Sequence, residues 1–358
     1  MEDAGQGEGE KRVTLHAAAC LTVQRPVLVG EQPCMRCADA CPSHAVRISP
    51  RRVEIVASAC TGCGHCAAAC PTGALTAQGF DLPAFAGPTR IECSRVAPED
   101  RAPGAAVAPC LGGLTRTALR TALLEGDVVL MDRGWCAGCP IAEAPAPWAA
   151  ALDDLEDEVA RTGHPHRAIA MRAPLDPARA GPPPQPPAPE ARSRRDWVAH
   201  LARGKPAAPV ADQVPPGAAE TPALLVRRDT LRAMAGGDVP AGLMPEVTRD
   251  GARPDAAFAA RLCPTGALTL ARGDGVERLV FDAARCIACG DCEAAGLALH
   301  TAGTRPYAGA VTVAELPVAT CARCRMRFRP ETDETTCAQC AKDDDIAALA
   351  HGLMRRRG

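Results

Sequence analysis

The sequence predicts an α+β protein of several small domains, in which two cysteine-rich domains flank a small α/β domain and a pair of cysteine knuckles ends the chain. Three observations predict this architecture. A cysteine-rich segment occurs twice, a proline-rich segment separates the two copies, and strand-like and helix-like segments alternate between the first copy and the proline-rich segment. The expected domains are 12–80, 88–173, a linker over 174–221, 222–305 and 306–358.

The composition indicates that metal binding adds to apolar burial in stabilising these small domains. Apolar residues make up 47% of the 358 residues, but aromatic residues, the largest packing anchors, make up only 3%. The chain holds 20 cysteines. Its start, MEDAGQGEGEKR, has no apolar run like that of a signal peptide, and no stretch has the apolar length of a membrane span. We therefore expect a cytoplasmic protein whose Cys-x-x-Cys pairs bind metal.

The charge balance and the absent motifs argue against several classes of function. A net charge of −2 and a pI near 6.5 differ from the strongly basic balance of a nucleic-acid-binding protein. The sequence has no C-x3-C-x2-C for radical S-adenosylmethionine chemistry, no C-x-x-C-H for haem attachment and no nucleotide-binding glycine loop. We expect no nucleic-acid partner and no enzyme activity of its own.

The cysteine-rich repeat reads Cys-Pro, a β-hairpin and then C-x2-C-x2-C. The first copy is CPSHAVRISPRRVEIVASACTGCGHC, residues 41–66, and the second is CPTGALTLARGDGVERLVFDAARCIACGDC, residues 263–292. Apolar and β-branched residues alternate on either side of residues 49–51 and 273–275, which predicts a hairpin in each copy.

The cysteine spacing predicts two [4Fe-4S] sites in the first domain. Three closely spaced cysteines on one loop supply only three corners of a cubic cluster, so the fourth ligand comes from a distant loop, often the neighbouring Cys-Pro. This geometry joins Cys41 to the triplet at 60–66, and Cys70 to Cys34 and Cys37. Over residues 15–80 the sequence resembles the bacterial two-cluster ferredoxin family. The second set is Cys41, Cys60, Cys63 and Cys66.

The fourth ligand of the first set is less certain from spacing, because Glu31 stands where the family has a cysteine. Cys20 is the nearest free cysteine upstream, and a longer interval costs little because loop-closure entropy grows slowly with length. We therefore prefer Cys20. An oxygen of Glu31, or a three-iron cluster without a fourth protein ligand, are the alternatives. The preferred first set is Cys20, Cys34, Cys37 and Cys70.

The second copy predicts a single [4Fe-4S] cluster. Its cysteines match the second set one for one, whereas the positions that match Cys34, Cys37 and Cys70 hold alanine or glycine. All the ligands of one cluster are absent together, so we expect side-chain packing in its place. The substituted positions are Ala256, Ala259 and Gly296. The third set is Cys263, Cys286, Cys289 and Cys292.

The segment between the first copy and the linker predicts a small, parallel-rich α/β sheet. Four cysteines lie at the expected strand ends, where sites gather in such sheets. The expected strands are 91–93, 104–110, 127–134 and 166–174, and the expected helices are 114–126 and 148–163. The middle set of cysteines is Cys93, Cys110, Cys136 and Cys139.

The middle set has two resemblances. Pro-Cys110-Leu-Gly-Gly, a helix, a strand and then Cys136-x-x-Cys139-Pro are similar, over residues 88–140, to the iron-sulfur delta subunit of methanogen-type hydrogenases. That resemblance implies a [2Fe-2S] cluster and electron transfer between larger subunits. VVLMDRGWCAGCP is also similar to the Trp-Cys-x-x-Cys of thioredoxins, although prolines after Cys139 weaken the helix that a dithiol needs. We prefer a four-thiolate metal site, [2Fe-2S] before zinc, over a dithiol or four unconnected thiols.

Two Cys-x-x-Cys knuckles near the carboxyl end predict a structural zinc site of the zinc-ribbon kind, with rubredoxin-like iron as the alternative. The polar segment between them, RMRFRPETDETT, favours zinc because it would leave an iron site wet. Arginines at 323, 325, 327 and 329 alternate at strand spacing, either to face an acidic partner or as a solvated strand face. The knuckle set is Cys321, Cys324, Cys337 and Cys340.

Several other features have two interpretations. The eight prolines of residues 174–189 predict a stiff linker without a helix, followed by a short helix around Trp197 that serves the linker or docks a partner. We expect His44 and His65 to lie at the surface or beside the clusters, not to bind metal. Gly112-Gly113 indicates a tight turn, although a phosphate site is the alternative.

Together the five sets account for all 20 cysteines. We expect an electron-transfer polyferredoxin with three [4Fe-4S] clusters, a [2Fe-2S] cluster in the middle domain and one zinc ion. Its partner would be a larger redox enzyme, molybdenum-dependent or hydrogenase-type. The alternative is an assembly factor that delivers clusters or sulfur to a metalloenzyme. A zinc-ribbon module for nucleic acid has little support from the charge.

Overall fold

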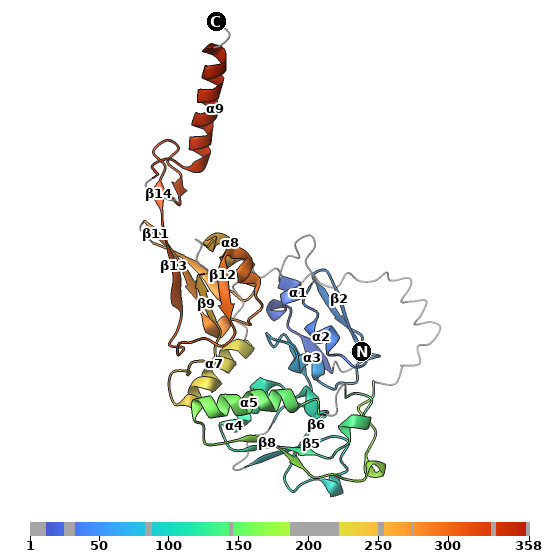
Figure 1. Ribbon diagram of the computed structural model, residues 1–358. Helices are drawn as coiled ribbons and strands as arrows, with labels where there is room; N and C mark the ends of the chain where they lie inside the picture. Colours follow the sequence, from blue (N-terminus) through green and yellow to red (C-terminus); the bar gives the residue numbers. More distant parts are fainter. Residues whose placement is uncertain are drawn as a thin grey trace, which may run out of the picture.

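In the computed structural model the two cysteine-rich units and the α/β unit lie together, and the knuckle strand β14 and helix α9 extend away from them (Figure 1). The two cysteine-rich units lie on the same side of the α/β unit. No helix among the residues described is both long and apolar enough to cross a membrane. The structure describes residues 12–24, 33–82, 88–142, 146–186, 222–249, 254–273, 275–330 and 334–355.

The first cysteine-rich unit is built from two antiparallel strand pairs and single helical turns. Its first and last strands pair with each other, and a hairpin lies between them in sequence. The turns η1, α2 and α3 precede or contain the cysteines. The elements are β1 (Val13–Leu15), η1 (Ala17–Ala19), α1 (Leu21–Gln24), α2 (Arg36–Asp39), β2 (Val46–Ser49), β3 (Arg52–Ile55), α3 (His65–Ala68) and β4 (Leu75–Ala77).

The second cysteine-rich unit repeats this pairing order. Its outer strands β9 and β12 pair antiparallel, and the hairpin β10–β11 lies between them, with β13 added as a third strand. The elements are β9 (Glu246–Arg249), α8 (Ala256–Leu262), β10 (Leu268–Arg272), β11 (Val276–Phe281), η6 (Ala283–Arg285), η7 (Asp291–Ala295), β12 (Leu297–His300) and β13 (Val311–Pro317).

Helix α8 occupies the segment that corresponds to the first cysteine loop of the other unit. Asp255 caps it by accepting a hydrogen bond from the backbone N–H of Phe258. Ala256 and Ala259, at the positions of two cluster ligands, are fully buried in the apolar core. Side-chain packing therefore fills this half of the unit, as the sequence predicts.

The α/β unit is a four-stranded parallel sheet in the order β6-β5-β7-β8. The predicted strands and helices are present, with ends shifted by a few residues. Thr115 caps α4 by accepting from the N–H of Ala118. The elements are β5 (Thr89–Cys93), η2 (Pro98–Asp100), β6 (Ala106–Ala108), η3 (Leu111–Gly113), α4 (Arg116–Leu123), β7 (Val128–Asp132), η4 (Cys136–Gly138), α5 (Ala149–Thr162) and β8 (Ala168–Arg172).

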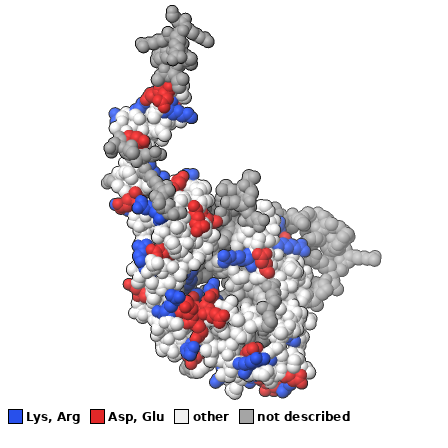
Figure 2. Space-filling model, in the orientation of Figure 1, with Lys and Arg blue, Asp and Glu red and all other residues white. Residues whose placement is uncertain are grey.

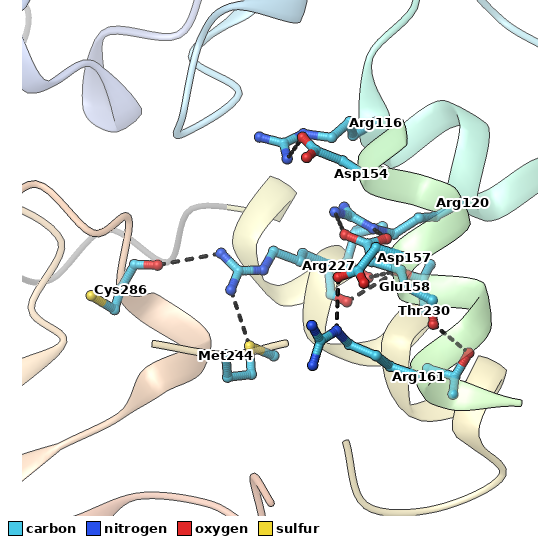
Figure 3. Close-up of polar contacts among 12 residues, drawn as sticks. Arg116, Arg120, Asp154, Asp157, Glu158, Arg161, Arg227, Thr230, Met244 and Cys286 are labelled. Carbon is cyan, nitrogen blue, oxygen red and sulfur yellow. Dashed lines mark hydrogen bonds and ion pairs between the residues drawn. The ribbon is translucent and has the colours of Figure 1, made fainter. Parts of the chain in front are cut away.

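Helix α7 (Pro222–Ala235) joins the α/β unit to the second cysteine-rich unit. It packs on α4 and α5, and its buried Leu231 belongs to one apolar core with Leu155 and Leu279 from the two sides. Figure 3 shows Arg227 of this helix beside the buried ion pair of Arg120 and Glu158. The two units therefore share a core and are not separated by solvent.

The linker differs in part from the sequence prediction. The linker includes a 3-10 turn, η5 (Pro177–Arg179), because Asp176 caps it, and Gly181 exchanges hydrogen bonds with Arg95 of the α/β unit. The predicted helix around Trp197 lies outside the described residues. The last elements are β14 (Ala319–Thr320), β15 (Arg327–Phe328) and α9 (Ala338–Arg355).

Candidate metal centres

The four cysteines of the first set line one small pocket together. Cys20 enters it because η1 and α1 fold the chain back, and the hydroxyl of Thr22 donates to the carbonyl oxygen of Cys34 at 3.1 Å. Burial raises the pKa of Cys20, with Cys70 and Cys34 adding to it, and raises that of Cys37 to about 11. Glu31 lies outside the described residues. Thiolates gathered in this way repel one another, and bound iron would offset that repulsion.

The second set gathers around Cys66. Burial, together with the neighbouring Cys63, Cys41 and Cys60, raises the pKa of Cys66 to about 12. Cys37 of the first set also contributes, so the two sets adjoin. The backbone N–H of Ala45 donates to the sulfur of Cys41 at 3.3 Å.

The third set lines a second pocket, built in the same way. The backbone N–H of Leu268 donates to the sulfur of Cys263 at 3.4 Å, the counterpart of the bond to Cys41. Burial raises the pKa of Cys286 to about 11 and that of Cys289 to about 12. Cys289 as a whole residue is nevertheless exposed, which places one edge of this set at the surface.

The Cys-Pro motifs of the two cysteine-rich units share a hydroxyl two residues after the cysteine, close to its sulfur. A hydroxyl at this distance donates to a thiolate, and such bonds shift the potential of a bound cluster. The Sγ to Oγ distances are 3.7 Å for Cys41 and Ser43, 3.6 Å for Cys70 and Thr72, and 3.9 Å for Cys263 and Thr265.

The two C-x2-C-x2-C loops have a left-handed backbone at the same position but carry different residues there. Gly62 has φ +73°, whereas the matching Ala288 has φ +53°, a left-handed conformation that costs a residue with Cβ about 1–2 kcal/mol. We expect Ala288→Gly to relieve this strain and raise the free energy of unfolding of the cluster-loaded protein. The gain is limited to about 1 kcal/mol because glycine loses more conformational entropy on folding. Gly62→Ala should lower it by at least as much, because its Cβ would lie 3.1 Å from Arg12.

Urea unfolding monitored by circular dichroism tests both variants under identical anaerobic conditions. A stabilised Gly62→Ala protein would contradict the strain assigned to this position.

The middle set gathers at the carboxyl ends of parallel strands. β5 ends at Cys93, β6 is followed by Cys110, and the loop after β7 holds Cys136 and Cys139. These ends share one edge of the sheet, so the thiols influence one another: burial raises the pKa of Cys110 to about 12 and that of Cys136 to about 11, and Cys93 adds to both.

The geometry around Cys136 gives little support to a thioredoxin-like dithiol. Only the 3-10 turn η4 begins at this cysteine, and the next α-helix in the described part of the chain, α5, begins at Ala149. The raised pKa of Cys136 is also opposite to the shift that activates a catalytic thiol.

A buried ion pair holds the middle set, and the sequence analysis missed it. Arg133 donates from Nε to Oε2 of Glu92 at 3.1 Å, and its Nη2 contacts Oε1 of the same carboxylate. Glu92 is fully buried and precedes Cys93, while Arg133 begins the loop to Cys136. The pair therefore ties two cysteine-bearing segments together. An acidic residue inside the apolar strand segment IEC was the available signal.

The knuckle set fits a single tetrahedral ion. Its four sulfurs lie within 4.8 Å of one another. Two ligands about 2.3 Å from one zinc ion are separated by at most about 4.6 Å, so the observed grouping is close to what zinc requires. Backbone N–H groups of Cys324 and Cys337 lower the pKa of Cys321 to about 6, favouring the thiolate.

The other sets are spread more widely. In the described part of the chain, the knuckle set is the only group of three or more metal-ligating side chains that meets this 4.8 Å spacing. A cluster of several irons holds its ligands further apart than one ion does, so wider spacing suits a cluster. The middle set likewise does not meet the 4.8 Å spacing.

The arginines between the knuckles do not form the predicted alternating strand face. β15 has only two residues, and Arg325 has φ +64°, which interrupts an extended strand. The other side chains bind within the chain: Arg323 pairs with Asp344, and Arg329 pairs with Glu277 of β11 at 2.6 Å. Arg329 therefore ties the knuckles to the second cysteine-rich unit, whereas Arg323 ties them to α9, and the predicted regular alternation at strand spacing was wrong.

The two histidines of the cluster loops differ in burial. His44 is exposed, whereas His65 is buried, with Nε2 3.3 Å from the sulfur of Cys110. Gly112 and Gly113 pack against this loop, which supports close packing over a phosphate site.

Comparison with protein-family models identifies a 4Fe-4S dicluster domain over residues 32–74. This segment contains seven of the eight cysteines of the first and second sets, and Cys20 lies outside it. It is therefore an iron-sulfur segment of ferredoxin type. No curated protein and no solved structure matches the chain.

Proposed function

We propose that the chain is an iron-sulfur electron carrier that relays electrons to or from a larger redox enzyme. In this proposal the first, second and third sets hold [4Fe-4S] clusters, the middle set holds [2Fe-2S], and the knuckle set holds structural zinc. The clusters would supply one-electron chemistry at potentials set by burial and by hydrogen bonds to sulfur. The dicluster family match supports this reading of the first unit.

The observation that carries the proposal is that successive sets adjoin. Cys37 of the first set lies close enough to Cys66 of the second to raise its pKa, and Cys63 of the second is packed against Cys110 of the middle set. A storage or purely structural protein has no need of such contacts, whereas electron hopping requires neighbouring centres.

Helix α7 extends this order to the third set. A Cβ on Gly73, three residues after Cys70, would lie only 2.4 Å from Cβ of Ala223, so the start of α7 touches the first set's loop. One turn later, Arg227 donates to the carbonyl oxygen of Cys286 at 3.4 Å (Figure 3). The contacts support a linear order of middle, second, first and third centres.

An anaerobic preparation with iron, sulfide and zinc counted per chain tests the proposal. We expect about fourteen irons, from three [4Fe-4S] clusters and one [2Fe-2S], together with one zinc. About twelve irons would remove the middle cluster. Fewer than eight irons after full reconstitution would contradict the relay as a whole. Electron paramagnetic resonance then assigns each cluster type.

A second candidate, delivery of clusters to another metalloenzyme, is favoured by one feature, the exposure of Cys289. An exposed ligand makes the third cluster accessible to an acceptor. Mixing the loaded protein with a chelator-prepared acceptor protein separates the two functions: a delivery factor loses iron to the acceptor, whereas a relay keeps its iron through repeated reduction and oxidation.

The partner is proposed from its chemistry and from the resemblance of residues 88–140. A molybdenum-dependent or hydrogenase-type oxidoreductase would consume or supply single electrons, as the resemblance of residues 88–140 suggests. The near-neutral net charge of −2 gives no support to a nucleic-acid partner.

A further inference from the structure

The second and middle centres meet at one side chain, His65. This residue lies between Cys63 and Cys66 in the loop of the second set. Gly64 before it has φ +80°, and the turn it makes is followed at once by the helical turn α3. The imidazole is 7% exposed, and its Nε2 lies 3.3 Å from the sulfur of Cys110 in the middle set.

The direction of this hydrogen bond follows from the chemistry of the acceptor. A cysteine sulfur bound to metal is a thiolate and carries no proton. In the cluster-loaded protein Nε2 would therefore carry the hydrogen and donate it to Cys110. Cys110 is itself buried, so water does not compete for the sulfur.

Two glycines make this approach possible. A Cβ on Gly112 would lie 2.7 Å from Nε2 of His65, and a Cβ on Gly113 would lie 2.1 Å from the carbonyl oxygen of Cys63. Neither glycine is among the residues with positive φ, so turn conformation does not explain them. Space does: only glycine at both positions lets the η3 loop of the middle unit lie directly on the loop of the second set.

We propose that His65 is the electronic link between the second and middle centres, donating a hydrogen bond to Cys110 that raises the reduction potential of the middle cluster. Reduction adds negative charge to the cluster, and an N–H directed at its sulfur stabilises that charge. His65 is also one peptide bond from Cys66, so a single covalent segment and one hydrogen bond connect ligands of both centres. This inference rests on the proposed function, because it requires a redox-active cluster in the middle set.

The test compares three variants of the full-length, reconstituted protein by redox titration with electron paramagnetic resonance. His65→Leu removes the donor, His65→Gln retains an N–H at similar reach, and His44→Gln is the exposed control. For His65→Leu we expect the electron-sharing equilibrium to shift about tenfold away from the middle cluster, about 59 mV for a one-electron couple. His65→Gln should recover most of the shift, and His44→Gln should cause none.

Iron content and a measurement on the unaltered protein keep the outcomes distinct. If His65→Leu loses iron, the test is instead made on the unaltered protein with its histidines labelled with ¹⁵N. We then expect a hyperfine coupling between ¹⁵N and the reduced middle cluster. An unchanged potential in an iron-replete His65→Leu protein, or no ¹⁵N coupling, would overturn the inference. Absence of any middle-cluster signal in the unaltered protein would instead overturn the proposed [2Fe-2S] cluster.

Discussion

Cys20→Ser should convert one [4Fe-4S] signal into that of a three-iron cluster, or abolish it, while the signals of the other centres remain. Cys20 lines the same pocket as Cys34, Cys37 and Cys70, and their thiols influence one another's pKa. Without Cys20 the cluster keeps three thiolates, and a corner iron without a protein ligand is readily lost. The measurements are iron content, expected to fall by one or four per chain, and electron paramagnetic resonance of the oxidised protein.

Glu31→Ala is the matched comparison for this variant. It removes the residue that stands at the family's ligand position and leaves all four thiols of the first set in place. We expect the spectrum and iron content to remain those of the unaltered protein. If Glu31→Ala disturbs the spectrum and Cys20→Ser leaves it unchanged, the ligand is the carboxylate.

Cys20 shows how far the spacing of cysteines predicts a site. The spacing and the low cost of a longer loop are enough to select this residue. The local structure that delivers it is not visible in the pattern: Ala19 and Thr22 are buried on either side, in two helical turns of three and four residues. Turns this short have no apolar period to detect.

The elements of the α/β unit are predicted well because they are long enough to show an apolar pattern. Residues 128–131 form a buried apolar run, and α5 is long enough to show a helical period, so burial alone specifies them. The contacts of His65 with Cys110 and of Glu92 with Arg133 join segments that lie 45 and 41 residues apart. Such pairs depend on how finished units pack, which no local pattern records.

Helix α7 illustrates the same limit at the scale of domains. Its sequence follows the linker and was assigned to the second cysteine-rich domain, yet its contacts are with α4 and α5 as well. Burial lowers the pKa of Arg227 to about 10, so the guanidinium stays charged at neutral pH. Because this cation donates to the backbone carbonyl oxygen of Cys286, it would favour the reduced form of the cluster proposed for the third set (Figure 3). Figure 2 shows acidic and basic side chains mixed over the visible face, with no extended basic region.

Arg133→Met should destabilise the α/β unit by about 3–5 kcal/mol and release iron from the middle set first. The variant leaves the carboxylate of Glu92 fully buried with only the backbone N–H of Ala102, at 3.0 Å, as a described partner. An uncompensated buried charge carries this cost in proteins. The loop to Cys136 also loses the hydrogen bonds that Arg133 donates to the carbonyl oxygens of Asp100 and Ala173, both at 3.1 Å.

Two controls separate the loss of the buried pair from the loss of any arginine. Arg116 pairs with Asp154 at 2.6 Å, but both side chains are more than half exposed, so Arg116→Met should change stability by less than about 1 kcal/mol. The double variant Glu92→Leu/Arg133→Met removes both charges and should be more stable than Arg133→Met alone. Urea unfolding and iron release to a chelator measure the series. If Arg133→Met keeps its iron and unfolds with the unaltered protein, the pair does not hold the middle set, and the two cysteine segments meet through apolar packing alone.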